Sequence, residues 1–234
     1  MIPLRDSEAA RRLTPATTLL IVLNTAVFVL EVEQAYQGRL ALERYAMVPA
    51  LVAHPGWLHP LHALRVLVTL VTATFLHAGL LHIAGNMLYL LIFGPAVEGR
   101  MGPRRFLLFY LLCGIAAGLG MVAMGPASRV PVIGASGAIA GVLGAYFVLY
   151  PRGRISTILP LFVFIRLVEV PAVFYLLAWF AVQLYAGISA GGQGPLVGGV
   201  AWWAHVGGFL FGVAAAPLLI HNARAKRPAR RKQC

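Results

Sequence analysis

Residues 134–150 read GASGAIAGVLGAYFVLY, an apolar stretch rich in glycine and alanine with Ser136 close to its start. A second such stretch, residues 201–213, reads AWWAHVGGFLFGV and contains His205. Polar side chains inside membrane segments are rare and usually functional. A serine hydroxyl becomes a nucleophile when a neighbouring base takes its proton, and histidine is the side chain that titrates near neutral pH. The two stretches therefore predict covalent hydrolysis within a membrane.

The composition indicates that the chain spans a bilayer. The sequence is 60% hydrophobic and 11% charged, and its mean hydropathy is +0.82. A helix that crosses the hydrocarbon needs about 20 mainly apolar residues. The segments that meet or approach this length predict an all-α membrane protein with six transmembrane helices, at residues 17–33, 81–97, 104–124, 135–150, 170–188 and 202–220. The fourth is short, so its first turn, with Ser136, is expected at the floor of a cavity that water can reach.

The positive charge is distributed asymmetrically. Only Arg39, Arg44, Arg65 and Arg129 of the 19 lysines and arginines fall on one side of the six predicted spans. The rest fall on the other side with both termini, and positive loops stay in the cytoplasm. The net charge of +12 is thus explained by topology rather than by nucleic acid as a partner. We expect a multi-pass protein of a bacterial plasma membrane with both termini cytoplasmic.

The chain divides into three parts. Residues 1–16 form a basic cytoplasmic N-terminus, residues 17–221 the six-helix domain, and residues 222–234 a basic cytoplasmic tail expected to meet anionic lipid headgroups. The first apolar run continues without a small-x-small cleavage site, so it is interpreted as a retained helix rather than a signal peptide. Residues 34–78 are too apolar for a free loop and predict short helices in the membrane interface.

Small residues line one face of two predicted helices. Four-residue spacing places Ser136, Ala140 and Gly144 on one face of the fourth span, and His205, Gly208 and Gly212 on one face of the sixth. Taken alone, a helix rich in glycine and serine favours a packing interface over a catalytic site. Two such faces can pack backbone to backbone, which would bring the serine oxygen within about 3 Å of an imidazole nitrogen.

A nucleophile also needs donors for the developing oxyanion. His82 and Asn86 lie four residues apart on one face of the second span, at the same membrane level as Ser136. The backbone N–H of Ser136 is at a helix N-terminus, where unpaired amides favour an anion. The alternative for His82 and Asn86 is an ordinary interhelical hydrogen bond. A metal site built from His77, His82 and His205 is disfavoured because five-residue spacing does not align histidines and no acidic partner is near.

Five motifs occur in one order along the chain. They read FLHAG at 75–79, LHIAGNM at 81–87, GPAVEGRMG at 94–102, GASG at 134–137 and AHVGG at 204–208. Together they closely resemble the rhomboid intramembrane serine proteases. The resemblance runs from about Phe75 to Gly212.

The resemblance implies a six-helix core that binds the transmembrane helix of a substrate protein and cuts it near the exterior-facing membrane boundary, without cofactor or metal. It implies Ser136 as nucleophile, His205 as general base, and His82 and Asn86 as oxyanion donors beside the Ser136 amide. Membrane lipids and transmembrane proteins are then the expected partners, and the oligomeric state stays open.

Other positions match structural motifs of that family. The matching residues are His77, Gly94, Glu98, Gly102, Gly134, Gly137 and Gly208. Glu98 is expected to stabilise the loop between the second and third spans, and His77 to shape the exterior loop. Residues 34–78 become the membrane-embedded first loop, and residues 170–188 the lateral gate.

Two positions depart from the pattern. Leu64-Arg65 stands where many members have Trp-Arg in the first loop, a change that affects loop rigidity more than chemistry. Ala140 stands where some relatives carry an aromatic ring stacked on the histidine. Trp202, Trp203 and Tyr146 are the candidates to replace that ring.

Two other function classes remain as alternatives. A catalytically silent rhomboid-like binder or chaperone of transmembrane helices would have no physical reason to keep serine, histidine and oxyanion donors together. A small transporter would show broken helices in related halves, and the sequence has no internal repeat.

Overall fold

The computed structural model describes residues 2–8, 14–38, 44–54, 56, 59–161, 164–190 and 200–220. Its elements, in chain order, are β1 (Ile2–Asp6), α1 (Pro15–Tyr36), α2 (Pro49–Ala53), α3 (Pro60–Thr72), the 3-10 turn η3 (Ala73–Phe75), α4 (Leu80–Met101), α5 (Pro103–Met124), α6 (Ser136–Leu149), β2 (Arg154–Leu161), β3 (Phe164–Pro171), α7 (Ala172–Ser189) and α8 (Trp202–Leu219). The predicted basic tail, residues 222–234, lies outside the described residues.

The helices agree closely with the six predicted spans. Among the described residues, α1, α4, α5, α7 and α8 are long and apolar enough to cross a membrane, and α6 is a shorter apolar helix. With 14 residues, α6 is about 21 Å long, less than a hydrocarbon core of about 30 Å. Residues Gly137 to Tyr146 are all buried, so protein rather than lipid surrounds this helix.

Proline and glycine set several helix boundaries. Pro15, Pro49, Pro60 and Pro103 occupy the first turns of α1, α2, α3 and α5, where a missing N–H costs nothing. Gly102 joins α4 to α5 with φ of +79°, a conformation that side-chain-bearing residues rarely adopt. The chain can therefore reverse sharply between the two helices.

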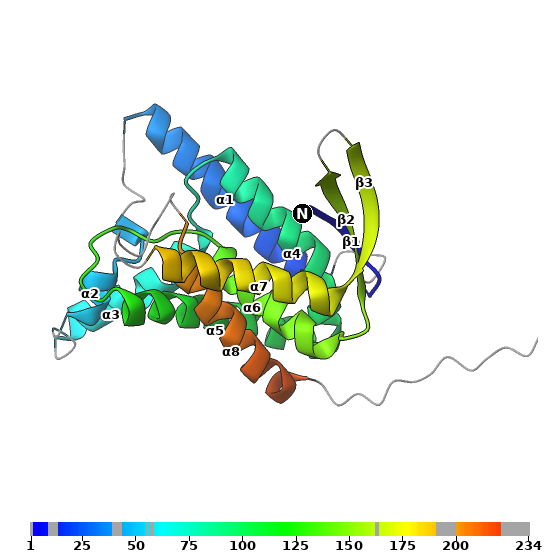
Figure 1. Ribbon diagram of the computed structural model, residues 1–234. Helices are drawn as coiled ribbons and strands as arrows, with labels where there is room; N and C mark the ends of the chain where they lie inside the picture. Colours follow the sequence, from blue (N-terminus) through cyan, green and yellow to red (C-terminus); the bar gives the residue numbers. More distant parts are fainter. Residues whose placement is uncertain are drawn as a thin grey trace, which may run out of the picture.

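The buried helix α6 is at the centre of the bundle. It packs against α8, α5 and α4, while α1 packs on α4 and α7 on α8. Figure 1 shows α1 and α4 side by side, with α2 and α3 at one end of the molecule and the sheet at the other. The main core has large side chains with no solvent exposure, including Phe93, Phe106, Phe109, Tyr110 and Tyr146. A second cluster joins the α2–α3 region to α5.

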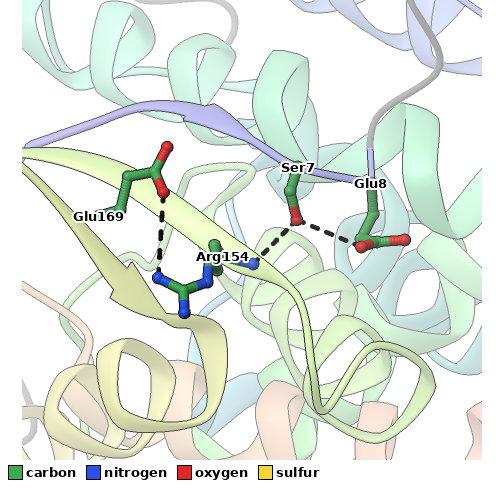
Figure 2. Close-up of polar contacts among 4 residues, drawn as sticks. All are labelled: Ser7, Glu8, Arg154 and Glu169. Carbon is green, nitrogen blue, oxygen red and sulfur yellow. Dashed lines mark hydrogen bonds and ion pairs between the residues drawn. The ribbon is translucent and has the colours of Figure 1, made fainter.

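The helical bundle carries a three-stranded antiparallel sheet that the sequence analysis did not predict. The order is β1-β2-β3, with Ile2 opposite Ile158 and Arg154 opposite Pro171. The Ser7 hydroxyl accepts the Arg154 backbone N–H at 2.9 Å, as Figure 2 shows. Arg154 and Glu169 also form an exposed ion pair at 4.0 Å, which contributes little to stability. The sheet therefore joins the N-terminal segment to the hairpin that follows α6.

Carboxylates link α1 to α4 at one end and to the segment just before α4 at the other. At one end the Glu98 carboxylate accepts the backbone N–H groups of Ala16 at 3.0 Å and Thr17 at 2.7 Å, and the Thr14 hydroxyl. At the other end the Glu31 carboxylate accepts the His77 backbone N–H at 3.0 Å. These side-chain contacts join α4 to α1, and the role of Glu98 in the loop between α4 and α5 stays a prediction. Its carboxylate satisfies free N–H groups at the start of α1, where the helix dipole favours a negative charge.

Candidate active site

The first turns of α4, α6 and α8 meet at one end of the bundle. Ser136 is the first residue of α6, and His205 lies in the first turn of α8. The Ser136 Oγ and the His205 Nε2 are 2.8 Å apart. His205 is buried, at 9% exposed, and Ser136 is half-buried. The structure thus brings together the serine and the histidine that the sequence singled out.

Backbone contact between α6 and α8 holds the two side chains at this distance. A β-carbon added to Gly208 would overlap the Gly137 carbonyl oxygen, and one added to Gly144 would overlap the Phe209 carbonyl oxygen. No side chain larger than hydrogen fits at these positions while the helices keep their separation. The predicted packing of two small-residue faces is confirmed.

The segment before Ser136 is fixed from two directions. The Gly134 N–H donates to the Ala73 carbonyl at 2.9 Å, and Met47 and Val132 exchange backbone hydrogen bonds of 3.1 and 2.7 Å. Gly134 itself has φ of +124°, and a β-carbon there would lie 2.8 Å from the His82 ring. Glycine is therefore required both for the turn and for the close approach of His82 to the start of α6.

The side chains of His82 and Asn86 on α4 have N–H groups that are available for the predicted role of oxyanion donors. Asn86 is 7% exposed, and its Nδ2 has no hydrogen-bond partner among the described residues. The Ala78 backbone N–H approaches the His82 Nδ1 at 3.4 Å. A backbone amide can only donate, so Nδ1 accepts and the His82 proton is on Nε2. A cavity beside Ser136 is lined by Gly134, Gly137 and Ala204 among others, so there is room for a small group next to the serine.

One polar residue of this site, Gln183, was not predicted from the sequence. The Gln183 Oε1 lies 2.7 Å from the His205 Nδ1, on the opposite side of the ring from Ser136. Gln183 is 6% exposed, and its Nε2 donates to the Trp179 carbonyl at 3.3 Å. The signal was present in the sequence, because an amide inside an apolar span is costly unless it has a partner.

Two indoles surround the His205 ring. The ring centroids of Trp179 and His205 are 5.9 Å apart with planes inclined by 37°, and Trp202 approaches edge-on with centroids 6.3 Å apart. Of the candidates to replace a ring at Ala140, Trp202 contacts the histidine. Trp179, which the sequence analysis did not consider, provides the more nearly parallel face.

His77 is a buried neighbour of Ser136 and His205 that contacts neither of them in the described hydrogen bonds. Its ring meets His82 edge-on, with centroids 5.1 Å apart. Burial, with a smaller effect of His82, lowers the pKa of His77 to about 4. Its Nδ1 lies 3.2 Å from the Phe75 carbonyl, which can only accept, so Nδ1 carries the proton. Neutral His77 thus orders the segment between η3 and α4.

No cluster of three metal-ligating side chains occurs within the described part of the chain. The polar groups around Ser136 are a hydroxyl, two imidazoles and two amides, a set typical of proton transfer and oxyanion binding.

Comparisons with known proteins agree with this geometry. The Rhomboid domain family matches residues 64–222. The putative rhomboid protease YdcA of Bacillus subtilis is 43% identical over 77 residues, which cover 33% of this chain and 38% of the relative. Rhomboid protease GluP of the same organism is 46% identical over 76 residues, 32% of this chain and 14% of the relative.

A longer alignment joins the chain to a mitochondrial relative. Rhomboid protein 1 of Saccharomyces cerevisiae is 31% identical over 150 residues, 62% of this chain and 40% of the relative. The chain thus spans less than half the length of each of these three proteins. The family match covers the helices that carry Ser136, His205, His82 and Asn86. This chain belongs to the rhomboid family and is an integral membrane protein with a rhomboid-like helical bundle.

Proposed function

We propose that this protein is an intramembrane serine endopeptidase that cleaves transmembrane helices of other membrane proteins near the exterior-facing membrane boundary. The observation that carries the proposal is the 2.8 Å contact between the Ser136 hydroxyl and the His205 Nε2 within a buried helix interface. A pure binding protein gains nothing from a hydroxyl aimed at an imidazole in this setting.

In the first half of the proposed reaction, His205 takes the Ser136 proton as the serine oxygen attacks a carbonyl carbon of the substrate. The carbonyl double bond opens, and the oxygen becomes an oxyanion. The Asn86 Nδ2, the His82 Nε2–H and the Ser136 backbone N–H are the donors assigned to it. Asn86 supports this role because its buried amide has no other partner among the described residues.

In the second half, the oxyanion re-forms the carbonyl and the peptide C–N bond breaks. His205 gives its proton to the leaving amine, which leaves an acyl ester on Ser136. A water molecule then attacks the ester with His205 again as base, which releases the new carboxyl end and restores the serine. Every proton moves through one imidazole.

The site restricts the substrates that it can cut. A helix in lipid hides its carbonyl groups in its own hydrogen bonds, so a cleavable helix needs glycine, proline or polar residues that loosen it. A small side chain at the cut fits the cavity lined by Gly134, Gly137 and Ala204. If cleavage were unchanged when helix-breaking residues of a substrate were replaced by leucine, this view of the substrate would be wrong.

The proposed topology places both termini in the cytoplasm. Strand β1 pairs with β2, and four spans, α1, α4, α5 and α6, lie between them. An even number of crossings puts both strands on one side of the membrane, which supports this topology. The starts of α4, α6 and α8 then face the exterior. The basic residues 222–234 follow α8 on the cytoplasmic side, where they would meet anionic lipid headgroups.

The test is cleavage of a single-span reporter protein, with a glycine-rich transmembrane helix, by the purified protein in liposomes. We expect the wild type to cleave and Ser136→Ala and His205→Ala to be inactive. Ser189→Ala is the matched control, because Ser189 is exposed at the end of α7. A fluorophosphonate probe should label the wild type and not Ser136→Ala. Reporter binding without cleavage or labelling by any variant would instead indicate a silent rhomboid-like binder.

A further inference from the structure

Gln183 makes the one described polar contact on the side of His205 that faces away from Ser136. It comes from the second half of α7, and its Oε1 lies 2.7 Å from the His205 Nδ1. Both side chains are at least nine-tenths buried. Because water does not compete for such a contact, the hydrogen bond restrains the ring strongly.

The orientation of the Gln183 amide follows from its second contact. Its Nε2 lies 3.3 Å from the Trp179 carbonyl oxygen, one helical turn earlier. A carbonyl oxygen can only accept, so the NH₂ group of the amide must face it. The amide oxygen therefore faces His205, and the reversed amide would place two acceptors against each other at Trp179.

The amide orientation in turn fixes the His205 tautomer. Since Oε1 can only accept, the His205 Nδ1 must carry the ring proton. The Nε2 lone pair is then free to accept the Ser136 hydroxyl proton across 2.8 Å. In the other tautomer, Nε2–H would face Ser136 and the ring could not act as a base. The chain of contacts from Trp179 through Gln183 thus selects the productive form.

We propose that Gln183 is a positioning residue that holds His205 in the Nδ1–H tautomer. As far as catalysis is concerned, this inference rests on the proposed protease function. Gln183 takes the orienting role that a buried carboxylate has in soluble Ser-His-Asp hydrolases. An amide performs it without burying a negative charge among apolar helices, where an ionised side chain is costly. Gln183 thus orients the His205 ring but does not stabilise the imidazolium with a negative charge.

The test compares three variants in the reporter assay. Gln183→Met keeps the length of the side chain and removes the acceptor, so kcat should fall about tenfold or more with little change in KM. Gln183→Glu restores an acceptor at the same place and should recover much of the lost kcat. Val22→Met, at an exposed position of α1, is the control and should match the wild type. Equal kcat in Gln183→Met and the wild type would overturn the proposal.

A spectroscopic measurement separates this proposal from the protease function. The ¹⁵N shifts of the histidine side chains, with His205 assigned from the His205→Ala variant, report the protonated nitrogen without any substrate. We expect the proton on Nδ1 in the wild type and a mixture of tautomers in Gln183→Met. A proton on Nε2 in the wild type would refute the tautomer assignment, whether or not the protein cleaves. If the reporter is not cut but the tautomer is as expected, only the protease function fails.

Discussion

The contact between α6 and α8 makes a quantitative prediction for Gly208→Ala. The added β-carbon would lie about 1 Å inside the usual carbon–oxygen separation of about 3.3 Å from the Gly137 carbonyl. Both atoms of this clash belong to, or are fixed on, helix backbone, so rotation of a side chain cannot relieve it. The helices must separate by about 1 Å, which would stretch the 2.8 Å Ser136–His205 contact beyond hydrogen-bond range. We expect cleavage to fall about 100-fold, with about 1–3 kcal/mol lost in stability.

The neighbouring glycine provides a matched control. A β-carbon at Gly207 would face α5 and lie 3.2 Å from the Ala116 carbonyl oxygen, which needs a shift of only a few tenths of an ångström. Gly207→Ala gains the same helix propensity as Gly208→Ala but leaves the α6 contact intact. Reporter cleavage, fluorophosphonate labelling and thermal unfolding in detergent should be measured for both. If Gly208→Ala cleaved within threefold of Gly207→Ala, the separation of α6 and α8 would not control the dyad, and the reasoning would be wrong.

Three further predictions concern Asn86, Glu98 and His77. Asn86→Ala should lower turnover about 10²–10³-fold, since it removes an oxyanion donor. It should leave the unfolding temperature unchanged, because the Asn86 amide nitrogen has no described partner. A matching loss of stability would argue for a structural role. Glu98→Gln should lower the unfolding temperature because it removes the charge that caps α1. Glu33→Gln, on the exposed side of α1, is the control and should not lower it. Equal unfolding temperatures of the two variants would contradict the cap. The pKa of His77 in the folded protein is about 4, below the ordinary 6.5, so the unfolded chain binds this proton more readily. The free energy of unfolding should therefore decline as the pH falls from 6.5 toward 4. His77→Gln should remove part of that decline in melting curves measured at several pH values. An identical pH dependence in His77→Gln and the wild type would exclude this source.

Hydrophobic length and small-residue spacing were sufficient to predict the helices and the contact between Ser136 and His205. The predicted spans differ from the observed helices by only a few residues, and Ser136 and His205 lie where two helix faces bare of large side chains meet. Such features are local in sequence. A run of apolar residues or a four-residue spacing contains the information without knowledge of any partner.

The features that the sequence did not reveal depend on distant pairs. Strand β2 pairs with Ile2–Asp6, about 150 residues earlier, so neither segment alone predicts a sheet. Glu98 caps a helix that begins more than 80 residues before it. Gln183 acts on His205 across the connection between α7 and α8, and nothing in its own helix identifies its partner. Only the three-dimensional packing shows which groups meet.

The contact between α6 and α8 also shields the distance between Ser136 and His205 from the bilayer. The distance from serine to histidine is set by backbone contact inside the bundle, where lipid exerts no direct force. The orientation of His205, in contrast, depends on α7, which has only 28% of its span buried. Thickness or lateral pressure of the membrane acts first on such peripheral helices. A change in lipid environment should therefore alter how often His205 carries its proton on Nδ1 before it alters the distance between His205 and Ser136.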